Sequence, residues 1–130
     1  KDTFVFVSAH YDHIGTRADG DGDRINNGAN DNASGTAGVL EVARVLASLK
    51  VRPKRTIVFV GWSAEEKGLR GSREYAKAPI FPAAKTVANI NLEQIGRTDD
   101  SEGARVKAVA VTGMDYSSVG KTLGELGTKI

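Results

Sequence analysis

The chain has 130 residues, of which 40% are hydrophobic and 26% are charged, and this composition is typical of one compact globular domain. Its 18 basic residues nearly balance its 16 acidic ones and are scattered along the chain, which argues against nucleic acid as a partner. The sequence has no cysteine and no apolar run close to the roughly 20 residues of a membrane span. We therefore predict a single domain over residues 1–130 without a membrane span, in which any metal chemistry falls to histidine and carboxylates.

The first half of the chain predicts a strand, a helix and a second strand. Residues 3–9 are aromatic and β-branched, and residues 55–62 form the nearly continuous apolar run of a strand buried on both faces of a parallel sheet. Between them, residues 33–50 carry one narrow polar stripe, which indicates a helix packed on that sheet. Pro53 stops the helix before the second strand, and the crossover should be right-handed.

The second half continues the alternation of strands and helices. Strands are predicted at 87–95 and 105–111, and helices at 71–78 and 115–126. The loop at 11–30 is long, polar and rich in glycine and aspartate, and loops of this length inside a compact domain are usually functional. The predicted fold class is α/β.

Acidic and histidine residues follow the predicted strands. His10 and Asp12 come after the first strand, Glu65 and Glu66 after the second, and Glu93 near the end of the third. Because ligands of open α/β sheets collect beyond the carboxyl ends of the strands, these side chains should converge. Asp12 is expected to accept the second ring proton of His10 and so to orient that imidazole.

Asp31, just before the first helix, completes the constellation of a two-metal hydrolase. Two divalent cations need a bridging carboxylate, terminal ligands and a free carboxylate that takes a proton from the attacking water. Asp31 could bridge, His10, Glu66 and Glu93 could be terminal ligands, and Glu65 could be the base.

Two of these residues also have an ordinary structural explanation. Asp31 stands at a helix start and could be a cap, a role for which Ser34 competes. Glu93 lies in an apolar segment, where an unpaired carboxylate is costly, and it could form a salt bridge with Arg97 or Lys67 instead of binding a metal.

Four stretches together resemble a known family. HYDH, NGANDNASG, RTIVFVGWSAEEKGLRGS and NINLEQIGR cover most of residues 4–97 and follow the order and spacing of the co-catalytic zinc peptidases. These include bacterial leucine-type aminopeptidases and glutamate carboxypeptidase II, with glutaminyl cyclases and the transferrin receptor as relatives. The resemblance implies a three-layer α/β/α domain with a mixed, largely parallel sheet. It also implies a metallo-aminopeptidase with peptide substrates and a secreted or periplasmic location.

The resemblance also assigns roles to the candidate residues. It implies that His10 and Glu93 bind one zinc ion, that Glu66 binds the other, that Asp31 bridges both, and that Glu65 is the general base or acid. A cis peptide bond after Asp31 is expected. The family more often has Asp at the position of Glu93, whose side chain is longer by one methylene.

One expected ligand is absent from the sequence. The family takes a second metal-binding histidine from a later segment, whereas this chain has only His10 and His13, both near its start. The second metal is then left with Asp31, Glu66 and water, so that one zinc ion or none is expected to remain. We therefore expect the chain to be part of a longer enzyme, beginning at a cut end.

Two other functions stay open on the same scaffold. A glutaminyl cyclase uses one zinc ion and transfers an acyl group, although the pair of His10 and Asp12 favours the two-metal peptidase. A non-catalytic interaction domain is the second alternative, although such relatives usually lose the paired acids that Glu65 and Glu66 preserve. A truncated sheet could also expose a surface through which the chain forms a homo-oligomer.

Overall fold

The computed structural model describes residues 2–98 and 110–127. The chain divides into two units, residues 1–97 and 98–130. The first unit contains three strands and two longer helices. These are β1 (Phe4–His10), α1 (Gly35–Ser48), β2 (Thr56–Trp62), α2 (Arg70–Lys77) and β3 (Thr86–Asn91). The order confirms the predicted alternation of strands and helices.

The three strands form a parallel sheet in the order β2-β1-β3. Val7 of the central strand pairs with Phe59 of β2 and with Ile90 of β3. Because β1 has a neighbour on each side, its residues from Phe6 to His10 are all buried. The largely parallel sheet of the prediction is confirmed, and the antiparallel strand expected of a mixed sheet is not among the three described.

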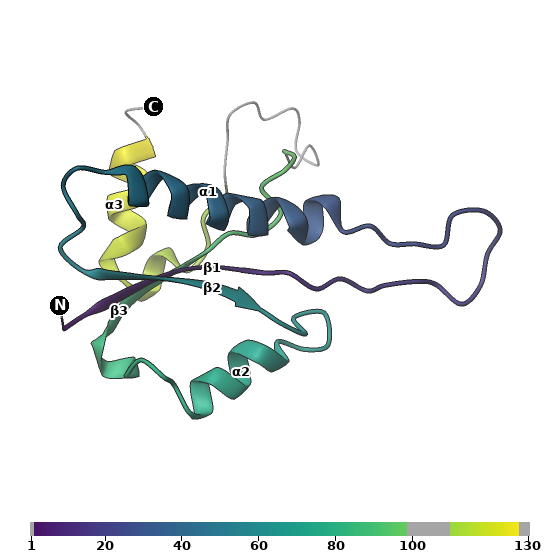
Figure 1. The fold of residues 1–130 in the computed structure, drawn as a ribbon, viewed down its shortest axis with the longest axis horizontal. Helices are drawn as coiled ribbons and strands as arrows, with labels where there is room; N and C mark the ends of the chain where they lie inside the picture. Colours follow the sequence, from purple (N-terminus) through teal and green to yellow (C-terminus); the bar gives the residue numbers. More distant parts are fainter. Residues whose placement is uncertain (1, 99–109, 128–130) are drawn as a thin grey trace. The chain divides into compact units, whose positions relative to one another are not determined.

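Helix α1 covers one face of the sheet (Figure 1). Val7 and Ala9 of β1 point to this face and form the buried core with Val39 of α1. Val42, Ile57 and Leu92 pack around that core. The side chains of β1 alternate between the two faces, so Phe6 and Ser8 point the other way.

Helix α2 covers the opposite face (Figure 1). The ring of Tyr75 lies 5.9 Å from the ring of Phe6 and 5.4 Å from that of Trp62, measured between centroids. Phe81, which follows α2, packs on Phe4 at 4.8 Å. Two helices on opposite faces of one parallel sheet give the three-layer α/β/α arrangement.

Two element boundaries differ from the prediction, the start of α1 and the end of β3, and both lie next to residues of the candidate site. The prediction began the first helix at Ala33, but α1 begins at Gly35 and is preceded by an irregular turn, Ala29–Ser34. The third strand was predicted to reach Ile95 but ends at Asn91, and Gln94 adopts a φ of 47°. The chain therefore turns out of the sheet before Glu93.

The second unit is described only for residues 98 and 110–127. It contains a short turn of 3-10 helix, Met114–Tyr116, and helix α3 (Ser118–Gly127), which confirms the helix predicted at 115–126. The strand predicted at 105–111 falls mostly outside the described residues. No helix among the described residues is both long and apolar enough to cross a membrane.

Candidate metal centre

His10 is the last residue of β1, and its side chain is only 2% exposed. Thr36, in the first turn of α1, donates its hydroxyl hydrogen to the His10 carbonyl at 2.9 Å, which joins the end of the strand to the start of the helix. The Nδ1 atom of the imidazole lies 3.1 Å from the backbone carbonyl of Asp12. A proton on Nδ1 satisfies this contact, and it leaves Nε2 free to bind a metal.

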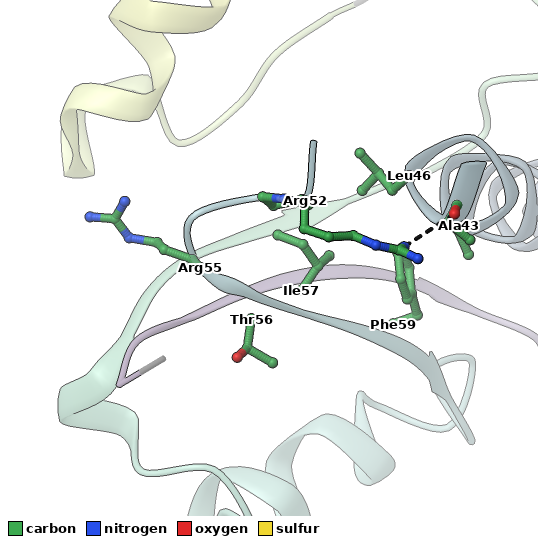
Figure 2. Close-up of a pocket in the computed structure, with 9 residues that line it drawn as sticks. Ala43, Leu46, Arg52, Arg55, Thr56, Ile57 and Phe59 are labelled. Atoms are coloured by element: carbon green, nitrogen blue, oxygen red, sulfur yellow. Dashed lines mark hydrogen bonds between the residues drawn. The ribbon is translucent and has the colours of Figure 1, made fainter. Parts of the chain in front are cut away.

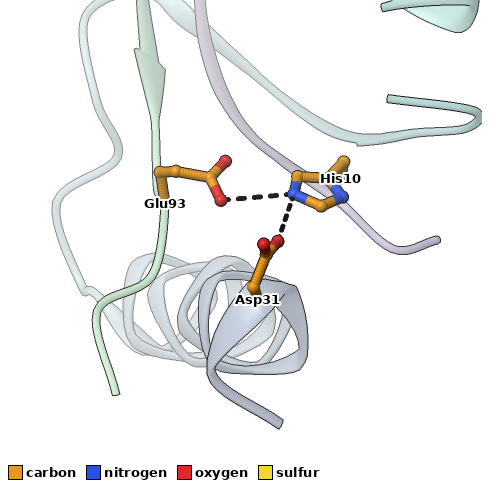
Figure 3. Close-up of side chains that lie close together, drawn as sticks. All are labelled: His10, Asp31 and Glu93. Atoms are coloured by element: carbon orange, nitrogen blue, oxygen red, sulfur yellow. Dashed lines mark hydrogen bonds and ion pairs between the residues drawn. The ribbon is translucent and has the colours of Figure 1, made fainter. Parts of the chain in front are cut away.

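The Nε2 atom of His10 faces carboxylates from three other parts of the chain. It lies 3.1 Å from Oδ1 of Asp31 and 3.2 Å from Oε1 of Glu93 (Figure 3). Glu65 is slightly farther away, with its Oε2 atom at 3.9 Å. The convergence predicted from the strand ends is therefore found for His10, Asp31, Glu65 and Glu93.

The electrostatics of this cluster favour a positive charge at its centre. Burial alone would lower the pKa of His10, but the charge and hydrogen bond of Glu93 and the charge of Glu65 raise it above its ordinary value. Partial burial raises the pKa of Glu93, and the charges of Asp31 and Glu65 add to this effect while His10 opposes it. Either a proton or a cation between the imidazole and the carboxylates relieves their repulsion.

The donor set is also one that a divalent zinc ion accepts. Imidazole nitrogen and carboxylate oxygen are common zinc ligands, and His10, Asp31 and Glu93 each offer one such atom within 4.8 Å of the others. The other ring nitrogen of His10, Nδ1, contacts a backbone carbonyl, and metal-binding histidines usually make such a contact with the nitrogen that does not bind the metal. These three residues therefore fit a zinc ion.

Asn32 positions two of these ligands, and the sequence analysis missed it. Its side chain is 2% exposed, and its Oδ1 atom accepts hydrogen bonds from the backbone N–H groups of Gly35 and Gln94, each at 3.1 Å. Its Nδ2 atom donates to the carbonyl of Leu92 at 3.0 Å and to Glu93 at 3.3 Å. An asparagine just before a predicted helix start was the available signal, because such side chains commonly cap helices.

Asp31 reaches the cluster from the turn that precedes α1. The Asp31–Asn32 peptide bond is cis, as the resemblance implied. The explanation of Asp31 as a helix cap is not supported, because the side chain that accepts the backbone N–H of Gly35, at the start of α1, is that of Asn32. The carboxylate of Asp31 remains directed at His10.

Asp12 holds the turn that carries the two adjacent glutamates. Its two carboxylate oxygens accept hydrogen bonds from the backbone N–H groups of Glu65 at 3.0 Å and Glu66 at 3.2 Å. Burial would raise the pKa of Asp12, but these two hydrogen bonds outweigh it and lower the pKa. The orientation of His10 was predicted to come from this carboxylate, which lies 3.7 Å from Nδ1, whereas the closer acceptor is the carbonyl of Asp12.

A second group of possible metal ligands adjoins the first and shares Asp31 with it. It consists of His13, Asp31 and Glu66, whose ligand atoms also lie within 4.8 Å of one another. Nδ1 of His13 lies 2.8 Å from Oε1 of Glu66. The sequence analysis gave the second position only Asp31, Glu66 and water, and the structure places His13 beside Glu66.

A groove in the first unit lies elsewhere. It is lined by Leu46 of α1 and by Ile57 and Phe59 of β2, and Arg52 crosses it to donate to the carbonyl of Ala47 at 3.1 Å (Figure 2). Its strand residues, Ile57 and Phe59, lie in the first half of β2, whereas the candidate ligand groups lie beyond the carboxyl ends of the strands. The groove is therefore separate from the candidate metal centre.

The structure thus defines an α/β protein whose parallel sheet carries, beyond its carboxyl edge, a histidine and carboxylates that could hold a divalent metal ion. The chain belongs to Peptidase family M28, whose sequence model matches residues 1–127. The resemblance predicted from the four motifs is thereby confirmed.

Curated relatives agree with this assignment. A protein of Pyrenophora tritici-repentis named "Probable zinc metalloprotease" is 37% identical over 103 residues, which are 78% of this chain and 23% of that protein. "Aminopeptidase YwaD" of Bacillus subtilis is 40% identical over 93 residues, 71% of this chain and 18% of the relative. "Aminopeptidase NAALADL1" of Mus musculus is 45% identical over 71 residues, 51% of this chain and 10% of the relative.

The chain spans less than a quarter of the length of each of these three relatives. No solved structure matches the chain.

Proposed function

We propose that the protein containing this chain is a zinc-dependent aminopeptidase, which removes residues from the N-terminus of peptides. The observation that carries the proposal is the position of Glu65. Its carboxylate lies 3.9 Å from Nε2 of His10, next to the ligand cluster, while its backbone is fixed by Asp12. A carboxylate so placed is suited to act as a base beside a metal rather than only as a ligand.

His10, Asp31 and Glu93 would hold one zinc ion, and Glu66 with Asp31 would contribute to a second. When bound, zinc supplies Lewis acidity, which polarises the scissile carbonyl and lowers the pKa of a water molecule. Asp31 belongs to both ligand groups, so it is the residue suited to lie between two ions. The side chains around these ligands would carry out the proton transfers of the reaction.

Glu65 would move the proton. Its side chain is 34% exposed, so a water molecule can reach it, and its place beside His10 directs that water toward the cluster. Glu65 accepts a proton from this water as the water attacks the scissile carbonyl, and it then donates that proton to the leaving amine. Asp12 serves this reaction by fixing the backbone from which Glu65 projects.

The charge of the site favours a substrate with a free amino terminus. Five carboxylates surround the cluster, and two zinc ions would supply four positive charges. The site would therefore keep a net negative charge, which attracts an ammonium group. These carboxylates belong to Asp12, Asp31, Glu65, Glu66 and Glu93. This charge supports an aminopeptidase over an enzyme that recognises a carboxyl terminus.

The test compares Glu65→Gln with Glu74→Gln in the complete protein. Glu74 is an exposed glutamate on α2 that pairs with Lys77, so its replacement is a matched control. We expect Glu65→Gln to retain bound zinc and to lose about 100-fold or more in kcat on a peptide with a free N-terminus, because general acid–base groups contribute on this scale. The control variant should keep both its bound zinc and its kcat.

Two results would contradict the proposal. Near-normal kcat in Glu65→Gln would remove Glu65 from its assigned role. Equal cleavage of the peptide and of its N-acetylated form would rule out recognition of a free amino terminus.

A further inference from the structure

We propose that Asn27 is a site of spontaneous covalent modification, at which the backbone nitrogen of Gly28 displaces the side-chain amide and aspartate or isoaspartate is formed. Both residues lie in the loop between β1 and the turn at Ala29–Ser34, and this loop projects beyond the carboxyl ends of the strands (Figure 1). The chemistry depends on the loop alone and is independent of the proposed function.

The first support is that the side chain of Asn27 is free. The chain has six asparagines, and the structure describes all of them. Five of their side chains form hydrogen bonds, namely those of Asn26, Asn30, Asn32, Asn89 and Asn91. Asn27 is exposed, and within the part of the chain that the structure describes its side chain has no hydrogen-bond partner. Its amide carbon is therefore open to attack.

The second support is the residue that follows Asn27. Asn27 is the only one of the six asparagines that precedes a glycine. Glycine has no Cβ atom to obstruct the approach of its backbone nitrogen to the neighbouring side chain. The backbone N–H of Gly28 also has no hydrogen-bond acceptor among residues 2–98 and 110–127, so no hydrogen bond has to break before this nitrogen reacts.

The reaction proceeds through a cyclic imide. The backbone nitrogen of Gly28 loses its proton and forms a bond to Cγ of Asn27, while the bond from Cγ to Nδ2 breaks and ammonia leaves with that proton. Water then opens the ring. Its attack at Cγ gives aspartate, and its attack at the backbone carbonyl carbon gives isoaspartate, whose main chain runs through Cβ and Cγ. The net change consumes one water molecule and releases one ammonia molecule.

The surroundings of Gly28 leave little room for this longer main chain. Gly28 has a φ of 64°, and a Cβ atom added there would lie 2.8 Å from the carbonyl oxygen of Asp31 and 2.8 Å from Cγ of His13. The carbonyl of Gly28 accepts a hydrogen bond from the backbone N–H of Ala33 at 2.9 Å. Isoaspartate at position 27 adds one carbon atom to the main chain directly before these contacts. The modification therefore loosens the turn that bears Asp31.

The experiment ages the complete, folded protein at neutral pH and physiological temperature and follows it by peptide mapping with mass spectrometry. Either product raises the mass of the residue by the difference between an amide and a carboxylic acid, and labelling by an isoaspartyl methyltransferase identifies the isoaspartate. Asn26 is the comparison within the same loop, because its amide donates to the carbonyl of Gly15 at 2.9 Å. Asn27→Gln and Asn26→Gln are the matched variants.

We expect the mass change at Asn27 and not at Asn26, and we expect Asn27→Gln to abolish it and Asn26→Gln to leave it. Because no hydrogen bond has to open, the rate in the folded protein should stay within about tenfold of the rate in the guanidinium-unfolded protein. In the aged protein, the backbone N–H of Ala33 should exchange with deuterium roughly 2–10-fold faster than in fresh protein, which is the effect of losing one hydrogen bond. Aged Asn27→Gln should show no such increase.

Three results would contradict the proposal. A folded-state rate more than about 100-fold below the rate in the unfolded protein would mean that the loop protects Asn27. Equal modification of Asn26 and Asn27 would mean that neither the free side chain nor the following glycine selects the site. Unchanged exchange at Ala33 in fully modified protein would overturn the effect on the turn, while the site of modification would stand.

Discussion

The carboxylate of Asp12 and the backbone N–H of Glu65 are joined by a hydrogen bond of 3.0 Å. The two residues lie 53 positions apart, so this contact fixes the loop after β1 against the turn after β2. The next residue in that turn, Glu66, binds the other carboxylate oxygen. One side chain thus positions a proposed base and a proposed ligand at once.

Replacing Asp12 with asparagine should weaken this connection. An amide offers one acceptor oxygen, and its NH₂ group would face the second backbone N–H, which leaves a donor without a partner. We expect the free energy of unfolding of the metal-free protein to fall by about 1–3 kcal/mol, measured by urea denaturation. Asp21→Asn, at an exposed position of the loop, is the control. Equal stability of the two variants would mean that the contact contributes nothing.

Two glycines of α1 should respond differently to alanine. A Cβ atom at Gly35 would clash with the carbonyl oxygen of Leu92, which is backbone and cannot move away easily. At Gly38 the nearest atom is the tip of the Ile95 side chain, at 2.8 Å. We expect Gly35→Ala to cost about 2–3 kcal/mol in the free energy of unfolding.

Gly38→Ala should stay within about 1 kcal/mol of the parent, because the gain in helix propensity offsets a small side-chain shift. Thermal unfolding of both variants checks the pair. A Gly35→Ala protein as stable as Gly38→Ala would contradict the close approach of Leu92 to α1.

Glu93→Gln should change stability and zinc affinity in opposite directions. The pKa of Glu93 is raised in the folded protein, so the ionised form is less favourable there than in the unfolded chain. Stability contributed by the protonated form is therefore present at low pH and is lost as the pH rises from the ordinary value of 4.5 through the raised value. Glutamine at position 93 cannot ionise, so the Glu93→Gln variant does not lose this stability as the pH rises.

We therefore expect metal-free Glu93→Gln to be more stable than the parent at pH 7 and to show little advantage at pH 4. Zinc affinity, measured by calorimetry at pH 7, should fall, because an amide oxygen is a poorer zinc ligand than a carboxylate. A variant that is less stable than the parent at pH 7 would contradict the raised pKa of Glu93.

The sequence predicted the sheet and most of the cluster because both depend on local patterns. Apolar runs located the three strands, and the ends of parallel strands necessarily meet at one edge, which brings His10, Glu65 and Glu93 together. The end of β3 was predicted too far along the chain, because no local signal marked the positive φ of Gln94.

The contacts of Asn32 and His13 could not be predicted in the same way. Asn32 bonds to Leu92, which is 60 positions away, and His13 meets Glu66 across 53 positions. Both contacts depend on the path by which a long loop returns to the sheet, and residue periodicity carries no information about that path. The secreted or periplasmic location and the homo-oligomer stay predictions.

The buried amide of Asn32 links the start of α1 to the segment that follows β3. The proposed ligand Asp31 precedes Asn32, and the proposed ligand Glu93 lies between Leu92 and Gln94, which the Asn32 amide contacts, so their separation is fixed only after the third strand has docked. A zinc ion between them would thus select the fully assembled sheet, and its binding energy would add directly to the cooperativity of folding. Only a correctly folded molecule would then bind zinc tightly.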